Sequence, residues 1–239
     1  MWFPSISGVI ERRILINYQV DGEVATRFLP RPFRPQLVDG KAIVGVCLIR
    51  LRSIRPSGLP AFIGLRSENA AHRIAVVWSD RGVEREGVFV PRRDTSSAMN
   101  ALAGGRIFPG LHHRSQFDVT EGDGRFLVAF RSEDGTSMSV EAQESADWNA
   151  TSVFPDLNAA STFMQRGAVG FSPSRVAGAF QGLELRTHNW QVTPLNVEAV
   201  HSSFFMNKRI FPEGSVKFDG AMLMRDIPHE WHSTPGLRS

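Results

Sequence analysis

The segment Pro91–Ser97 is the part of the sequence that points most directly to chemistry. It follows a predicted strand and opens a predicted helix. Arg92 and Arg93 can each grip a carboxylate through two parallel hydrogen bonds. Thr95 and Ser96 would then stand at the start of the helix, where free backbone N–H groups attract anions. The segment therefore predicts a binding corner for a small acidic molecule.

A structural alternative explains the same residues and stays open at the level of sequence. In this interpretation Asp94 or Thr95 caps the helix through its side chain. Arg92 and Arg93 would pair with nearby acidic side chains, because structural ion pairs also occupy such corners.

Glu68 and Asn69 form a second candidate site. They follow the segment 55–65, which is rich in Pro and Gly and is predicted to be a loop, and they precede a strand. A carboxylate at the rim of a pocket can act as a general acid or base when burial raises its pKa. We expect Glu68 to be buried beside an arginine, and the alternative is a solvated turn residue.

Other kinds of chemistry find little support in the sequence. His112 and His113 are adjacent, so on a strand they would point to opposite faces and could not readily share a metal ion. No serine stands in a Gly-x-Ser-x-Gly elbow, and neither a phosphate loop nor a dinucleotide fingerprint is present. We therefore expect no metal and no cofactor.

The basic residues restrict covalent chemistry. The chain has 27 Lys and Arg residues, and because only Lys41, Lys208 and Lys217 are lysines, the other 24 are arginines. Arginine stays protonated and cannot act as an amine nucleophile, whereas a desolvated lysine can. The net charge is +3. The arginines are scattered among acids rather than gathered in a basic stripe, so we expect no nucleic-acid partner.

The pattern of apolar residues predicts a mainly β (α+β) protein, an antiparallel β-barrel or strongly curved sheet with a few short helices. The predicted strands are 13–20, 41–52, 72–78 and 83–90, then a meander over 116–142, and finally 183–192, 197–205 and 215–224. The predicted helices are 22–29, 95–103 and 157–166, and Asp21 and Asp156 are the expected N-caps of the first and last.

Residues 1–232 are predicted to form a single domain and residues 233–239 a frayed tail. Cys47 is the only cysteine, and its place in the apolar run 42–49 predicts a buried, reduced thiol that fits a cytoplasmic protein. The sequence shows neither a signal peptide nor an apolar run near the roughly 20 residues that a spanning helix needs. We expect a soluble protein without a membrane partner.

Several motifs resemble a known bacterial family. They are Arg13–Asp21, Phe28–Pro30, Leu37–Gly40, Val44–Leu48, Arg55–Pro60 and Pro91–Ser97. On these motifs the chain resembles, over nearly its whole length, the domain of unknown function 2071 family, which is related to acetoacetate decarboxylase. The resemblance implies a cone-like antiparallel β-barrel with a few peripheral helices and an internal pocket.

The related decarboxylase uses a pocket lysine that forms a Schiff base with the keto acid, and a glutamate and an arginine that position it. By motif order, the resemblance places the arginine at Arg12 or Arg13 and the glutamate at Glu68. It places the lysine position near Met99 or Asn100, where this chain has no lysine. Because neither side chain can form an imine, the resemblance implies the fold without Schiff-base decarboxylation.

Three functions fit these observations. The first is a protein that binds a small organic acid or related metabolite in its pocket. The second is an enzyme, a non-covalent lyase or hydrolase, with Glu68 as acid or base and arginines as electrostatic clamps. The third is a structural or interaction protein whose pocket is vestigial, and the resemblance also allows a homo-oligomer. The expected binding residues are Arg12, Arg13, Asn69, Arg92, Arg93, Thr95, Ser96 and Asn100.

Overall fold

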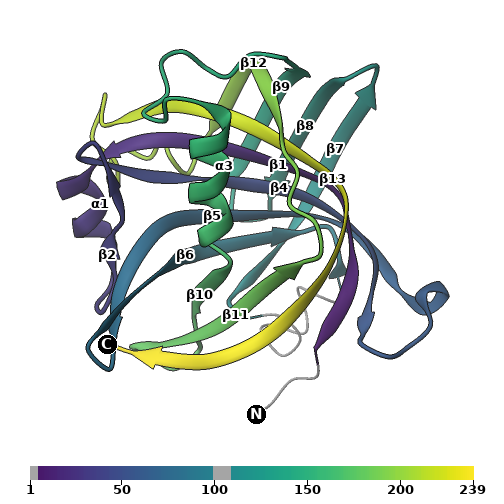
Figure 1. The fold of residues 1–239 in the computed structure, drawn as a ribbon, viewed down its shortest axis with the longest axis horizontal. Coiled ribbons are helices and arrows are strands. Elements are labelled where there is room, and N and C mark those ends of the chain that lie inside the picture. The colour runs from purple at the N-terminus through teal and green to yellow at the C-terminus, as the bar shows by residue number, and fades with distance from the viewer. Residues whose placement is uncertain (1–4, 99–108) are drawn as a thin grey trace.

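The computed structural model describes residues 5–98 and 109–239 of the chain (Figure 1). The described residues form one 13-stranded sheet with few helices, so the protein is mainly β as predicted. The strands are β1 (Ile6–Asp21), β2 (Arg34–Pro35), β3 (Leu37–Val38), β4 (Lys41–Pro56), β5 (Leu65–Asp80), β6 (Val83–Thr95), β7 (His112–Gly122), β8 (Arg125–Ser132), β9 (Ser137–Glu144), β10 (Val169–Pro173), β11 (Ala179–Thr187), β12 (Thr193–Ser202) and β13 (Val216–Arg238). The helices are α1 (Gly22–Phe28), the short 3-10 helix η1 (Ala61–Ile63) and α3 (Leu157–Arg166).

Long neighbouring strands build the centre of the molecule, in the order β13–β1–β4–β5–β6. Tight turns join several strands, and at Arg81-Gly82 and Asp123-Gly124 both turn residues have positive φ angles. Two consecutive residues with positive φ are typical of the type I′ turn, whose twist matches that of the strands it connects. These turns separate the strands predicted at 72–78 and 83–90 and lie within the meander predicted at 116–142, and they fix the register of β5 with β6 and of β7 with β8.

The sheet closes into two rings that share the central strands. In the first ring, β6 leads through β7, β8, β9 and β12 back to β13. In the second, β6 pairs with β10, and β10 leads through β11 to the far end of β13. The predicted barrel is therefore a pair of joined rings, and Figure 1 shows the strands curving around the molecule with α3 lying across them.

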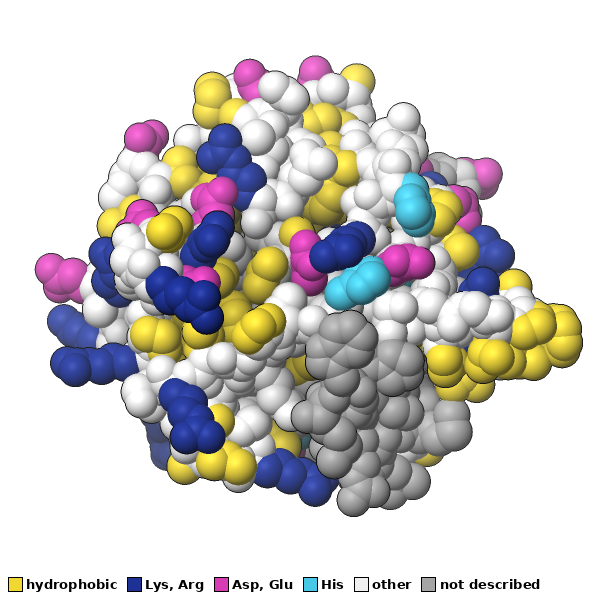
Figure 2. All heavy atoms as spheres, turned by 60° about the horizontal axis from the view of Figure 1, so that its bottom comes forward, with side chains coloured by type: hydrophobic (Ala, Val, Ile, Leu, Met, Phe, Trp, Pro, Cys, Tyr) yellow, Lys and Arg dark blue, Asp and Glu magenta, His cyan; other side chains and the backbone are white. Residues whose placement is uncertain are grey.

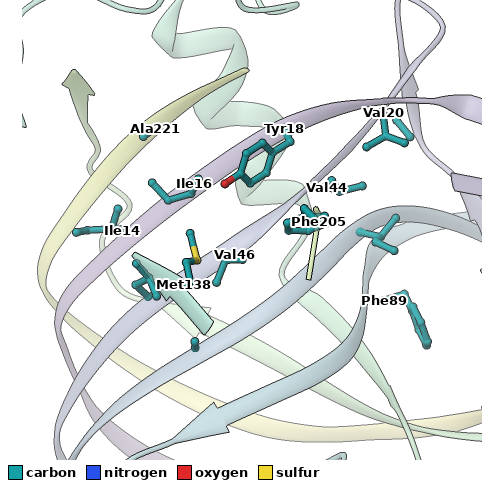
Figure 3. Packing of buried hydrophobic residues seen from close by; sticks show 14 of the residues in the cluster. Ile14, Ile16, Tyr18, Val20, Val44, Val46, Phe89, Met138, Phe205 and Ala221 are labelled. Atoms are coloured by element: carbon teal, nitrogen blue, oxygen red, sulfur yellow. The ribbon is translucent and has the colours of Figure 1, made fainter. Parts of the chain in front are cut away.

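The main apolar core lies on one face of the central strands. Ile14, Ile16 and Tyr18 from β1 and Val44 and Val46 from β4 point to this side, as Figure 3 shows. Successive side chains of a strand point to opposite faces, so the residues between them supply a second cluster. That cluster includes Leu15, Ile43 and Cys47, and α3 packs over it through Ala160 and Met164. The buried position predicted for Cys47 is confirmed.

The helices at 22–29 and 157–166 are confirmed as α1 and α3. Asp156 caps α3 by accepting a hydrogen bond from the Ala159 N–H at 2.7 Å, whereas the Asp21 side chain makes no such bond to α1. No helix in the described part of the chain is long and apolar enough to cross a membrane.

The prediction of a helix beginning at Thr95 is wrong. Strand β6 continues to Thr95, which pairs with Asn69 of β5 and Arg114 of β7. These neighbours use the backbone hydrogen-bonding groups that a helix start would have left free for an anion. Ala98 is helical, and residues 99–103 of the predicted helix lie outside the described residues.

The prediction of a frayed tail at 233–239 is also wrong. Strand β13 runs to Arg238, and its last residues pair with β11 from Leu183↔Ser233 to Ala179↔Arg238. The sequence pattern missed this because Thr234, Pro235 and Gly236 interrupt the apolar alternation by which strands are recognised. These last residues of β13 help to close the second ring.

Truncation after His232 should therefore destabilise the protein. Losing several strand hydrogen bonds to β11 should lower the free energy of unfolding by about 2–4 kcal/mol, measured by urea denaturation. Removal of Ser239 alone is the matched control and should cost less, because Ser239 lies beyond β13 and hydrogen-bonds only to the Gly178 carbonyl among the described residues. An unchanged midpoint after truncation at 232 would contradict the pairing.

Candidate functional site

Alternation along the central strands divides the predicted site residues between two faces. Arg12, Arg50 and Glu68 are successive cross-strand neighbours on β1, β4 and β5 and share face 1, which is turned toward β7 and β8. The next residue along β1, Arg13, lies in the row of Ile49, Asn69 and Thr95. This row belongs to face 2, which is turned toward β10, β11 and α3. The predicted residues therefore form two separate clusters.

The cluster around Glu68 on face 1 is a closed set of ion pairs. Arg12, which is 1% exposed, reaches Glu68 Oε2 at 2.6 Å and Glu121 Oε1 at 2.7 Å. Arg50 donates through Nε to Glu68 Oε1, and its Nη1 forms an ion pair with Glu121 Oε1 at 2.8 Å. Glu68 thus lies beside an arginine and is only 16% exposed, as expected. Both of its oxygens are engaged, and two guanidinium groups face two carboxylates.

Arg92 is also held on face 1 by acidic partners. Its guanidinium contacts Asp94 at 2.7 Å and Asp134 at 2.5 Å. Asp94 is fully buried and also accepts hydrogen bonds from Ser115 and Ser132. The hydrogen bond from Arg92 holds the pKa of Asp134 well below its usual range. Arg92 therefore follows the structural alternative given for the segment Pro91–Ser97, in which the arginines pair with nearby acidic side chains.

Basic and acidic side chains lie next to one another on the molecular surface as well. Figure 2 shows one face of the molecule, on which arginine or lysine, acidic and histidine side chains are interspersed. Among the residues that the structure describes, no group of three His, Cys, Asp or Glu side chains is placed to hold a metal ion.

His72 lies fully buried next to the Asp94 network. Its ring packs on Phe204 at a centroid distance of 4.5 Å, and neither ring nitrogen has a hydrogen-bond partner in the described part of the chain. Burial lowers the pKa of His72 to about 4. The nearest Asp94 oxygen, 3.7 Å from Nδ1, is already engaged by Arg92. The folded state therefore holds this imidazole neutral.

Replacing His72 should change the response of the protein to acid. The unfolded chain binds a proton at His72 below about pH 6.5, whereas the folded chain does so only near pH 4. The stability associated with neutral His72 is therefore complete above pH 6.5 and is lost as the pH falls toward 4. Between pH 7.5 and 4.5, His72→Phe should lose about 1–3 kcal/mol less than the wild type in urea unfolding. Exposed His201→Gln is the control, and parallel losses in wild type and His72→Phe would refute the assignment.

Face 2 carries a different arrangement, which we call the arginine pocket: Arg13, Cys47, Arg73 and Arg93. Arg73 donates through Nε to Cys47 Sγ at 3.2 Å, and Arg13 donates through Nη2 to the same sulfur at 3.4 Å. Arg93 Nε lies 3.4 Å from Ser172 Oγ. Two of the three guanidinium groups thus hydrogen-bond to one thiol, and the three come from β1, β5 and β6.

No carboxylate compensates the arginine pocket. Within residues 5–98 and 109–239, none of its three arginines forms an ion pair, and residues 1–4 and 99–108 contain no Asp or Glu. Burial lowers the pKa of Arg73, and it lowers that of Arg93 to about 10. Burial alone would raise the pKa of the Cys47 thiol, but the charges of Arg13 and Arg73 outweigh it and lower that pKa. The pocket therefore holds excess positive charge.

A cavity of about 90 Å³ opens onto these four side chains. A second hollow of about 50 Å³ adjoins it, because both are lined by Arg93 and by the apolar side chains of Ile49, Ala71 and Leu183. Asn69 lines the second hollow, and its Oδ1 accepts a hydrogen bond from Thr95 at 2.8 Å. Of the predicted binding residues, Arg13, Asn69 and Arg93 thus line this space, and Thr95 is linked to it through its hydrogen bond to Asn69.

The other predicted residues lie elsewhere. Ser96 is exposed and pairs with the backbone of Glu68 through its N–H and its hydroxyl. Arg12, Glu68 and Arg92 belong to face 1, and Glu68 does not line the cavity. Asn100, like Met99, falls outside the described residues.

Sequence reasoning missed Arg73 and the environment of Cys47. A signal for Arg73 was present in the sequence. Arg73 shares one face of a predicted strand with Ala71 and Ala75, and an arginine on the apolar face of a strand is unusual. Cys47 gave no such signal, since a lone cysteine in an apolar run is usually a small hydrophobic residue of the core.

A larger hollow of about 340 Å³ lies near Tyr18, Phe205 and Phe211. Its lining is mostly apolar, and burial raises the pKa of Tyr18. The charged side chains at its rim, Lys208 and Glu213, pair with each other at 2.8 Å. This hollow offers no excess charge, so the arginine pocket is the candidate functional site.

The closed cluster on face 1 should matter mainly for stability. Glu68→Gln leaves the buried Arg12 charge with only Glu121, and it should lower the free energy of unfolding by about 1–3 kcal/mol at pH 7. Glu84→Gln is the matched control, because Glu84 pairs with Arg34 on the surface and should contribute less than about 1 kcal/mol. Equal effects in urea denaturation would argue against a structural role for Glu68.

Comparison with known proteins agrees with this architecture. The chain resembles several solved structures. One is an acetoacetate decarboxylase-like enzyme from Sphingomonas wittichii RW1, with a TM-score of 0.59 and 10% identity over 98% of this chain and 92% of that one. Another is acetoacetate decarboxylase from Legionella pneumophila, with a TM-score of 0.61 and 12% identity over 98% and 88%. The enduracididine biosynthesis enzyme MppR in complex with pyruvate matches with a TM-score of 0.56 and 14% identity over 100% and 91%.

These likenesses define the class: the chain has the acetoacetate decarboxylase-like fold. A search of curated proteins finds no match. Residues 10–218 match the model of the domain of unknown function 2071 family, described as an uncharacterized conserved protein, and the chain belongs to that family.

Proposed function

We propose that this protein binds a small organic acid in the arginine pocket, and that it does so without forming an imine. The observation that carries the proposal is the set of three guanidinium groups that face a cavity and have no carboxylate partner. A buried charge without a counter-charge is costly, and an anionic ligand would offset that cost on binding. Arginine also suits a carboxylate because its planar fork can donate two parallel hydrogen bonds.

The relatives support a small acid as the ligand class. One of the similar solved structures, that of MppR, is a complex with pyruvate. Apolar walls from Ile49, Ala71 and Leu183 and a volume of about 90 Å³ favour a molecule of comparable, small size. Pockets of this kind typically combine an apolar lining with a few polar groups that fix the orientation of the ligand.

The lysines support binding without a Schiff base. Lys41 pairs with Asp21 at 2.5 Å and is 44% exposed, and Lys208 is 71% exposed. Lys217 is exposed as well, and none of the three lines the arginine pocket. An imine needs a desolvated amine within reach of the carbonyl carbon, so the residues around this cavity favour non-covalent binding.

The alternative of an enzyme that uses Glu68 as acid or base is less favoured. Glu68 accepts hydrogen bonds from Arg12 and Arg50 and lies on the face opposite the cavity. A vestigial pocket is also less favoured, because the cavity is open and its arginines lack counter-ions.

A thermal-shift screen over short carboxylic acids tests the proposal. We expect pyruvate or a similar acid to raise the melting temperature of the wild type by mass action. Arg93→Gln should abolish the shift, whereas Arg85→Gln should keep it, because Arg85 lies on the same strand but is 57% exposed. Borohydride added with pyruvate should leave the mass of the protein unchanged. A covalent adduct on a lysine, or equal shifts in both variants, would overturn the proposal.

A further inference from the structure

The number of charges in the arginine pocket restricts the ligand further. Arg13, Arg73 and Arg93 supply three positive charges. In the described part of the chain, Cys47 is the one acidic group that hydrogen-bonds to these arginines. Asp94 also lines the adjoining hollow, but its carboxylate is engaged by Arg92, Ser115 and Ser132. No carboxylate pairs with the three arginines, and residues 1–4 and 99–108 contain no Asp or Glu. A thiolate carries one charge. The pocket therefore keeps at least two uncompensated positive charges when it is empty.

The contacts of the Cys47 sulfur show which arginine charges a thiolate at this position can compensate. Its sulfur accepts from Arg73 at 3.2 Å and from Arg13 at 3.4 Å. Arg93 instead directs its Nε toward the neutral Ser172 hydroxyl, which lies 3.4 Å away. Arg13 and Arg73 thus share one thiolate through hydrogen bonds, whereas Arg93 interacts with that sulfur only through its charge.

The shape of the space matches this uneven distribution of charge. Arg93 lines both the cavity of about 90 Å³ and the adjoining hollow of about 50 Å³. Arg13 and Arg73 line only the larger one. One acidic group in the larger cavity can meet Arg13 and Arg73, while a second acidic group of the same molecule meets Arg93.

We infer that the ligand of this pocket is a small dianion, in which two acidic charges are held on a short apolar spacer or on one phosphoryl group. The inference rests on the proposed function and narrows it from any organic acid to a doubly charged one. A monoanion would leave one positive charge buried and unpaired, and such a charge costs free energy in a site of low dielectric. The apolar walls and the small volume exclude a long or highly hydroxylated molecule.

Two classes of compound supply such a dianion, namely short dicarboxylates and phosphate monoesters. Both are small molecules that carry two negative charges. Malonate and malonamate are a matched pair of probes, because the second differs only by an amide in place of one carboxylate. Methyl phosphate represents the phosphoryl source. Titration calorimetry on the full chain at pH 8 measures all three.

We expect malonate or methyl phosphate to bind at least about tenfold more tightly than malonamate. Arg93→Gln should reduce the ratio of malonate to malonamate affinity to about one, while Arg93→Lys and Arg85→Gln should preserve it. Near-ultraviolet circular dichroism checks that each variant is folded. Tighter binding of methyl phosphate than of malonate would assign the phosphoryl source.

The outcomes separate the two proposals. Equal affinity for malonate and malonamate, with the loss of both in Arg93→Gln, would overturn the dianion and leave acid binding in place. A preference for malonate that persists in Arg93→Gln would also overturn the dianion assignment at Arg93. Binding of none of the probes, together with no thermal shift from any short acid, would overturn the proposed function itself.

Discussion

The alternation of side chains along β1, β4, β5 and β6 is the constraint on which the rest of the structure depends. Arg12 and Arg13 are neighbours on β1, but their side chains point to opposite faces of the sheet and contact different partners. On face 1, Arg12, Arg50 and Arg92 pair with carboxylates. On face 2, Arg13, Arg73 and Arg93 contact a thiol, a thioether, an amide, a hydroxyl and an indole ring, and none of them pairs with a carboxylate in the described part of the chain. The division arises because a strand presents its side chains with a period of two. A slip of one residue in β1 would exchange the two environments.

Each ring covers one face of the central strands with a different set of strands. Strands β7 and β8 bring Glu121 and Phe130 over face 1, while β10 and β11 bring Ser172 and Leu183 over face 2. Enclosure lowers the effective dielectric, which strengthens a satisfied ion pair and makes an unsatisfied charge more costly. The same architecture therefore pairs the buried charges on one face and leaves those on the other without carboxylate partners, which is the feature that carries the proposed binding of an acid.

The fold could be predicted further than the site. Apolar alternation and turn residues located most strands, and motif resemblance supplied the architecture. The end of β6 and the pairing of residues 233–238 could not be predicted, because both depend on partners distant in the sequence. Glu68 and Arg93 were both expected among the residues of one pocket. Only the register shows that Asn69, not Glu68, accompanies Arg93 beside the cavity.

Strand β13 comes later in the chain than β1, β11 and β12, the strands with which it pairs. It runs beside β1 over most of its length, meets β12 near Ala221, and meets β11 from His229 onward. Neither ring can close before residues 216–238 have been synthesised. β1 pairs with β4 on one edge, but the strand that pairs with its other edge is some two hundred residues away. Such long-range pairing slows folding. During translation the nascent chain thus exposes the apolar rows of β1 and β4, and a holding chaperone would have its longest period of access to these rows.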